Sequence, residues 1–113
     1  YDCPAKPREI SGMADAAAFM ETHFAEAVPI SEVIERSHYS QRHFIRLFSS
    51  AYGMTPQRYL LDVRIRHATS MLRDSGLSVT EIAMRCGFGD PNYFSRIFRK
   101  YVGSSPSEFR GNR

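Results

Sequence analysis

The 113-residue sequence contains little cysteine and no long apolar run, and each shortage excludes a class of protein. Two cysteines, Cys3 and Cys86, are too few for a disulfide framework or a thiolate metal site. The longest uncharged apolar run spans residues 16–20, far short of the ~20 residues of a membrane span, and no apolar h-region follows a basic N-terminus within this segment. We therefore expect one domain, or two small lobes sharing contacts, in the reducing cytoplasm.

Residue groupings that enzymes and metal sites use are also missing. The sequence has no Ser/His/Asp arrangement, no paired carboxylates and no glycine-rich phosphate loop. Its four histidines do not combine into a metal-ligand spacing; they are His23, His38, His43 and His67. We therefore predict no catalytic residue, no metal site and no cofactor, and an enzyme is the least favoured class.

Charge is distributed unevenly along the chain. Residues 1–35 hold seven acids and two bases, a net charge of −5, whereas residues 36–113 hold thirteen bases and five acids, a net charge of +8. Twelve of these thirteen bases are arginine, the side chain suited to forked contacts with phosphate and guanine. A polyanionic partner is one interpretation, and an ordinary solvated surface with a local excess of charge is the other.

Apolar residues recur at helical spacing after a short N-terminal tail. Residues 1–10 contain Pro4 and Pro7 without periodic apolar positions, so they are predicted to be a tail or interdomain linker, and residues 11–113 the folded domain. A first amphipathic helix follows, marked by Met13, Ala16, Ala17, Met20 and Phe24. No segment alternates with a period of two, and no hairpin signal occurs. The prediction is an all-α fold.

The sequence also repeats itself at an offset of 50 residues. The matching positions are Phe44, Arg46, Phe48, Gly53 and Pro56 with Phe94, Arg96, Phe98, Gly103 and Pro106. Upstream the offset becomes 49, so one residue is inserted near Gly89 in the second copy. Each copy is predicted to hold a short helix, a tight turn, a longer helix, and a Gly before a Ser/Thr-Pro pair.

Capping residues support these boundaries. Ser78 and Ser105 each precede a Glu by three residues, the spacing of a capping box. Thr55 and Asp90 each precede a Pro, which is suited to a first helical position. The segments are therefore predicted at about 30–52 and 79–101 for the two copies and about 56–73 for a connector helix of 18 residues between them.

A short helix, a turn and a longer helix form the helix-turn-helix unit, whose second helix enters the major groove of DNA. Each predicted second helix has an apolar stripe and an opposite outer face. The stripes are Phe44, Leu47, Phe48 and Ala51 in one copy and Phe94, Ile97, Phe98 and Tyr101 in the other. The outer faces hold Arg42, Ile45, Arg46 and Ser49, and Asn92, Ser95, Arg96 and Arg99. These types suit guanine, adenine and thymine-methyl contacts, and an exposed Ile45 is hard to explain otherwise.

Several residues admit a structural interpretation beside a functional one. A surface Arg is often only solvated, but Arg46 and Arg96 occupy equivalent places in the two copies, which favours DNA contact. His43 starts a second helix and is a candidate neighbour of phosphate or base. Cys86 aligns with Ser37 before the turn, where a small semi-buried side chain fits, so a structural role is favoured over a redox role.

The stretch from Ser78 to Lys100, closing with Gly103 to Arg110, resembles the signature of the AraC/XylS transcription regulators, and residues 35–44 resemble the family's first unit. The resemblance covers roughly residues 11–111. It implies about seven helices in two helix-turn-helix subdomains, whose second helices enter successive major grooves of double-stranded DNA, usually to activate transcription. One departure is His38, which replaces the turn glycine found at Gly87 and calls for a strained or altered turn.

The leading hypothesis is therefore the DNA-binding domain of a bacterial-type transcription activator, with RNA polymerase as a partner. The alternative is a helix-turn-helix-shaped protein-interaction module without specific DNA contact. The candidate DNA-binding residues are Ser40, Gln41, Arg42, His43, Ile45, Arg46, Asn92, Tyr93, Ser95, Arg96, Arg99 and Lys100. The absent initiator Met and the Pro-containing tail favour a fragment preceded by an effector or dimerisation domain.

Overall fold

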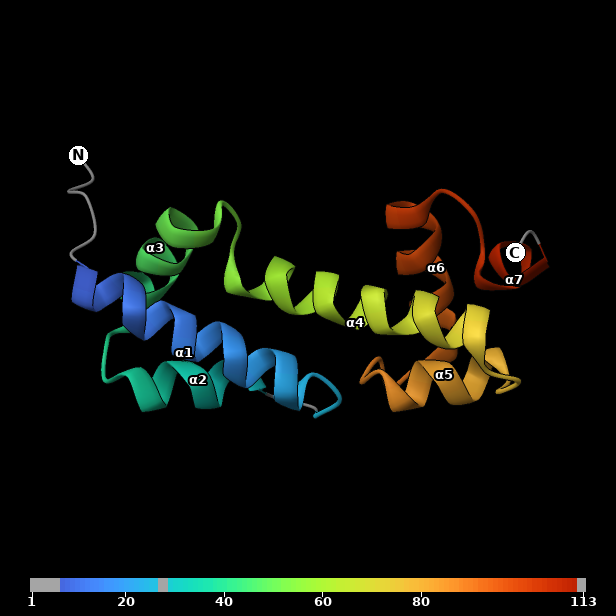
Figure 1. Cartoon of the computed structure of the whole chain (residues 1–113), viewed down its shortest axis with the longest axis horizontal. Helices are drawn as coiled ribbons and strands as arrows, with labels where there is room; N and C mark the ends of the chain where they lie inside the picture. The colour runs from blue at the N-terminus through green and yellow to red at the C-terminus, as the bar shows by residue number, and fades with distance from the viewer. Residues whose placement is uncertain (1–6, 27–28, 112–113) are drawn as a thin grey trace. The chain divides into compact units, whose positions relative to one another are not determined.

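A computed structural model describes residues 7–26 and 29–111, and these residues form seven α-helices and no strands (Figure 1). The helices are α1 (Pro7–His23), α2 (Pro29–Ser37), α3 (Gln41–Tyr52), α4 (Pro56–Asp74), α5 (Val79–Arg85), α6 (Pro91–Val102) and α7 (Pro106–Gly111). The prediction of an all-α fold with seven helices is confirmed. None of the helices in this part of the chain is long and apolar enough to span a bilayer.

The predicted boundaries are close to those observed, with one correction. Helix α1 begins at Pro7, so the last four residues of the segment predicted to be a tail or interdomain linker, 7–10, belong to the first helix. A proline near a helix start costs no hydrogen bond, because the first amide hydrogens of a helix have no partner within it. Cys3 and Pro4 lie outside the described residues. The connector helix α4 has 19 residues, one more than predicted.

The chain divides into two compact units, each built around one helix-turn-helix. Unit 1 holds residues 1–24 and 28–62, and unit 2 holds residues 25–27 and 63–113, so α4 contributes to both. In unit 1, α1 packs along α2 and against α3 (Figure 1). Its buried core is Met13, Ala16, Ala17, Met20, Val33, Phe44, Leu47, Phe48 and Leu60. The helical face predicted for the first helix is thus the face that α1 buries.

In unit 2, α6 packs against α5 and α7, and the second part of α4 belongs to the same unit. Its buried apolar residues are Val63, Ala68, Leu72, Ile82, Ala83, Cys86, Phe88, Phe94 and Phe98. The same ring contact recurs in both units, because Phe48 meets Tyr59 edge-on at 5.3 Å and Phe98 meets Phe109 edge-on at 5.6 Å. The offset of 50 residues in the sequence therefore corresponds to one aromatic packing arrangement used twice.

Most of the predicted caps form hydrogen bonds as expected. The Ser78 hydroxyl accepts from the Glu81 amide at 3.1 Å, and the Thr55 hydroxyl accepts from the Arg58 amide at 3.2 Å. Ser105 forms a complete capping box, in which its hydroxyl accepts from the Glu108 amide and its own amide donates to the Glu108 carboxylate. These bonds satisfy amide hydrogens that have no partner within their helices.

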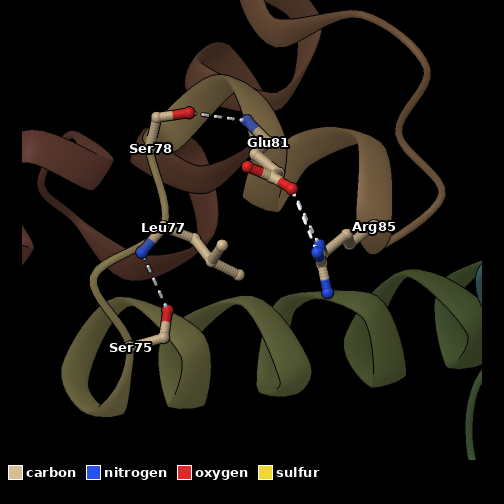
Figure 2. A network of polar contacts seen from close by, with 5 residues as sticks. All are labelled: Ser75, Leu77, Ser78, Glu81 and Arg85. Carbon is tan, nitrogen blue, oxygen red and sulfur yellow. Dashed lines mark hydrogen bonds and ion pairs between the residues drawn. The ribbon is translucent and has the colours of Figure 1, made fainter.

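The end of α4 is joined to α5 by a short polar turn (Figure 2). The Ser75 hydroxyl donates to the Met71 carbonyl at 2.7 Å and accepts from the Leu77 amide at 3.3 Å. Three residues into α5, the Glu81 carboxylate accepts from Arg85 at 3.0 Å (Figure 2). Ser75 thus follows the last residue of the connector helix, and its hydroxyl bonds both that helix and the turn that leads to α5.

Candidate nucleic-acid interface

Helix α3 is the second helix of the first helix-turn-helix, and its first turn is held by two local contacts. The Ser40 hydroxyl caps it by accepting from the His43 amide at 3.1 Å. The His43 ring lies on the Tyr39 ring with centroids 4.9 Å apart. Ser40 therefore has a capping role that accounts for its presence, and Tyr39 is a supporting residue absent from the predicted site. Its aromatic character four residues before His43 was the available signal.

The outer face of α3 carries exposed polar side chains beside a half-buried apolar one. Gln41, Arg42 and Arg46 are exposed, while His43 and Ile45 are half-buried. The expectation of an exposed Ile45 is therefore wrong, because its side chain lies partly against its own unit. Ala51, placed in the apolar stripe, is exposed instead, since it comes near the end of the helix.

Helix α6 is the equivalent second helix of unit 2 and has its own cap. The Asp90 carboxylate accepts from the Asn92 amide at 3.0 Å, and Pro91 follows at the first helical position. Phe94 and Phe98 are fully buried, as predicted. Tyr101, placed with them in the apolar stripe, is 37% exposed and lies under the Lys100 ammonium at 5.8 Å, so its inclusion in the stripe is wrong.

The remaining predicted residues of α6 divide by exposure. Asn92, Tyr93, Arg96, Arg99 and Lys100 are exposed, and Ser95 is half-buried. Five candidate DNA-binding residues therefore lie exposed on the surface of α6. Gln41, Arg42 and Arg46 likewise lie exposed on the surface of α3.

The arginines on these two helices differ in their partners. Arg99 donates to the Glu108 carboxylate of α7 at 3.2 Å, with both side chains largely exposed. Within residues 7–26 and 29–111, Arg42, Arg46 and Arg96 have no carboxylate partner. Three guanidinium groups are therefore available to an external anion. Arg99 can bind such an anion only by breaking its bond to Glu108 or by bonding both groups at once.

Two pKa shifts describe the surroundings of α6. Hydrogen bonds from Ser105, and then the charge of Arg99, lower the pKa of the Glu108 carboxyl, so Glu108 is charged when it pairs with Arg99. Burial raises the pKa of the Cys86 thiol to about 11 against the weaker opposing effect of Arg64, and its sulfur lies 3.9 Å from that of Met71. Cys86 is thus a buried neutral thiol, as expected of a packing residue.

Long-range contacts of the second unit were missed from the sequence. Arg64 is half-buried in α4 and donates to the Glu26 carbonyl at 2.8 Å, and burial lowers its pKa. Arg110 donates to the carbonyls of Leu72 and Ser75. These three bonds join residues 35 to 38 positions apart, and no local pattern marks them.

The sequence of this chain matches a known protein family. Residues 33–112 match the family described as a helix-turn-helix domain. The chain belongs to this family, the DNA-binding domain of AraC/XylS-type transcription regulators. The relatives that it matches are transcription regulators.

Individual relatives agree with this assignment. The chain is 47% identical over 96 residues to the HTH-type transcriptional activator RhaS of Salmonella arizonae, covering 85% of this chain and 34% of RhaS. The chain thus spans about a third of the length of the curated relatives it matches. Among solved structures, the DNA-binding domain of AdpA in complex with a target DNA is 34% identical, with a TM-score of 0.85 over 89% of this chain and 91% of AdpA's. The C-terminal domain of the response regulator AraT of Geobacillus stearothermophilus is 27% identical, with a TM-score of 0.86 over 90% and 85%.

Proposed function

We propose that this domain binds a specific double-stranded DNA site by placing α3 and α6 in two successive major grooves. The observation that carries the proposal is the pair Arg46 and Arg96. These residues occupy equivalent positions on two capped helices, both are exposed, and neither has a carboxylate partner among the described residues. Other surface arginines of the chain, such as Arg58 and Arg85, are paired with carboxylates on their own helices.

Base recognition is divided unequally between the two helices in this proposal. Arg42 and Arg46 of α3 offer two forked donors, which suit the O6 and N7 acceptors of guanine. On α6, Asn92 suits adenine and Arg96 suits guanine. The half-buried Ile45 and Ser95 present small surfaces that suit a thymine methyl group and a polar base edge respectively. Gln41, His43, Tyr93 and Lys100 flank these residues and are assigned to phosphate or neighbouring bases.

The length of α4 agrees with two grooves on one face of DNA. Its 19 residues make a helix of about 28 Å at 1.5 Å per residue. Successive major grooves on one face are ~34 Å apart, so the length of α4 is of the same order as this repeat. The domain assignment that follows is one helix-turn-helix at 30–52, the connector from Pro56, and a second helix-turn-helix at 79–101.

The larger regulator is part of the same proposal. The match covers only 34% of RhaS, and RhaS is named as an activator. We assign this domain to an activator that works with RNA polymerase in the cytoplasm and that also has an effector-binding or dimerisation domain. Two-domain regulators of this kind couple a ligand to DNA binding through differential affinity.

Arg96→Ala tests the proposal. We expect it to weaken binding to a site selected from randomised duplexes by ~1–3 kcal/mol while binding to random duplex changes less, because a forked base contact discriminates between sequences. Arg85→Ala is the matched control, since Arg85 is exposed and paired on α5. Affinities are measured by fluorescence anisotropy at two salt concentrations.

Three results would contradict parts of the proposal. Equal losses on selected and random duplex would make Arg96 a phosphate contact only. An equal loss in Arg85→Ala would indicate a general charge effect. If the parent protein shows no salt-dependent affinity for any duplex, the domain is a protein-interaction module instead.

A further inference from the structure

Helix α7 contacts two elements of unit 2 that the proposed function requires, the connector α4 and helix α6, which with α3 is called a reading helix below. It is only six residues long, so it forms few hydrogen bonds of its own. It is held by contacts from side chains on three successive residues, Glu108, Phe109 and Arg110. Two of these face α6 and the third faces α4.

The contacts with α6 are one ring pair and one ion pair. Phe109 meets the buried Phe98 edge-on at 5.6 Å, and Glu108 accepts from Arg99 at 3.2 Å. An aromatic pair of this geometry contributes orientation as well as buried area. The ion pair is exposed and therefore contributes little stability by itself. Of these two contacts with α6, the ring pair of Phe109 is therefore the stronger, and Pro106 is the buried residue of α7.

The hydrogen bonds from α7 to the end of α4 come from Arg110. Its Nε donates to the Leu72 carbonyl at 3.1 Å, and its Nη2 donates to the Ser75 carbonyl at 3.3 Å. The last carbonyls of a helix lack partners within it and carry partial negative charge, so a half-buried guanidinium is a favourable cap. Ser75 is the residue where the chain leaves α4 (Figure 2). The planar guanidinium of Arg110 bonds both carbonyls at once, and a lysine ammonium would not reproduce this paired geometry.

Comparison with unit 1 explains why a contact like that of Arg110 with α4 is needed in unit 2 alone. The helix that follows reading helix α3 is α4 itself, so Phe48 packs on Tyr59 at the start of the connector. The helix that follows reading helix α6 is the separate α7. The position equivalent to Arg110 in the first copy is Leu60, a buried core residue. In unit 1 the helix that follows α3 is the connector itself, so a covalent link joins them. In unit 2 the hydrogen bonds of Arg110 join α7 to the connector instead.

We propose that Arg110 is a positioning residue for DNA recognition, which fixes the orientation of α6 relative to α4 within unit 2. The proposal rests on the proposed reading of DNA by α6. Arg110 acts through α7: its fork fixes α7 on the end of α4, and Phe109 and Glu108 transmit that position to α6. Loss of the fork leaves α6 folded but free to tilt. Base contacts require placement within about 0.5 Å and 10–20°, so tilting lowers specificity before it lowers general affinity.

The first test measures orientation without DNA. Residual dipolar couplings of backbone amides in α4 and α6 report the angle between these helices in the parent, Arg110→Met, Arg110→Lys and Arg85→Met. Arg85→Met is the matched control, because it also removes one guanidinium charge from unit 2, but from an exposed side chain that bonds within its own helix. We expect Arg110→Met to change or broaden the distribution of that angle by more than about 10°, Arg110→Lys to be intermediate, and the control to match the parent.

The second test measures specificity at a temperature where circular dichroism shows each variant to be folded. We expect Arg110→Met to lose about tenfold in affinity for a selected site and less than about twofold for random duplex. In a randomised-site selection, the lost base preference should fall in the half of the site that Asn92→Ala also alters. If Arg110→Met does not fold, Arg110→Lys carries both measurements.

The outcomes separate this proposal from the proposed function. An unchanged angle between α4 and α6 would overturn it, as would a lower melting temperature with an unchanged ratio of selected to random affinity, which would make Arg110 a stabilising cap only. Equal losses on both duplexes would make it a phosphate contact and overturn it as well. A changed angle in a protein whose parent binds no specific site would contradict the proposed function while leaving the attachment to α4 intact.

Discussion

The two units use one packing plan and differ in the turn before each reading helix. In unit 2 the chain leaves α5 through Gly87 at φ 88°, and the Phe88 amide donates directly to the Ala83 carbonyl at 3.0 Å. This is the bond pattern of a glycine-terminated helix. In unit 1 the left-handed position is His38 at φ 63°.

A serine hydroxyl replaces the direct bond in unit 1. The Ser37 hydroxyl donates to the Ile34 carbonyl at 2.6 Å and accepts from the Tyr39 amide at 3.2 Å. It thus stands between the two groups whose counterparts meet directly in unit 2. The buried Cys86, at the position equivalent to Ser37, makes no such bridge. The comparison shows that a helix-turn-helix turn tolerates a non-glycine residue when a neighbouring side chain completes the bonds of the helix end.

The largest expected effect tests whether the two units are also energetically separate. Phe48→Ala and Phe98→Ala each remove a fully buried ring, so each should lower the free energy of unfolding by about 3–5 kcal/mol. We expect Phe98→Ala to remove amide protection from α5, α6 and α7 first, and Phe48→Ala to remove it from α1, α2 and α3 first. Urea titration and amide hydrogen exchange measure the two quantities.

A simultaneous loss of protection in all helices, for both variants, would contradict separate units. It would mean that α4, shared by both, couples them into one cooperative domain. The conservative variants Phe48→Leu and Phe98→Leu provide the control, since they retain most of the apolar volume and should cost less.

A smaller effect tests the comparison at the level of DNA. Arg42 and Asn92 are equivalent in the repeat and both are exposed. We expect Arg42→Ala and Asn92→Ala each to cost ~1–3 kcal/mol on the selected site, with base preference lost in different halves about one helical turn apart. Randomised-site selection on each variant measures this. Altered preference at the same two or three base pairs would disprove the two-groove arrangement.

How much of this could be predicted from the sequence depended on the range of the interaction. The caps at Ser78 and Ser105 and the buried rings of the repeat were predictable, because each follows from spacing within a few residues. The early start of α1 at Pro7 was missed because no apolar period marks residues 7–10. Tyr101 was misplaced because helical spacing put it in the apolar stripe, whereas its side chain is exposed near the C-terminal end of α6.

Contacts between helices that lie far apart in the sequence could not be predicted from it. Arg99 was predicted as a DNA contact, yet its ion pair with Glu108 crosses from α6 to α7. Arg110 closes the end of α4 across 38 positions. Each requires knowing which helices pack together, and side-chain type alone does not give that. The candidate site was thus predictable by helix face, while its supporting residues were not.

The smallest expected effect concerns the turn itself. A non-glycine residue in the left-handed region is strained by roughly 1 kcal/mol, and glycine loses a comparable ~0.5–1 kcal/mol of chain entropy on folding. His38→Gly should therefore change the free energy of unfolding by less than about 0.5 kcal/mol, whereas Gly87→Ala should cost about 1–2 kcal/mol. Urea titration of both variants, with His38→Ala as the control for loss of the ring, measures the difference. A loss above about 1 kcal/mol in His38→Gly and His38→Ala alike would show that the imidazole itself stabilises unit 1, and that the serine bridge is not what makes the non-glycine turn tolerable.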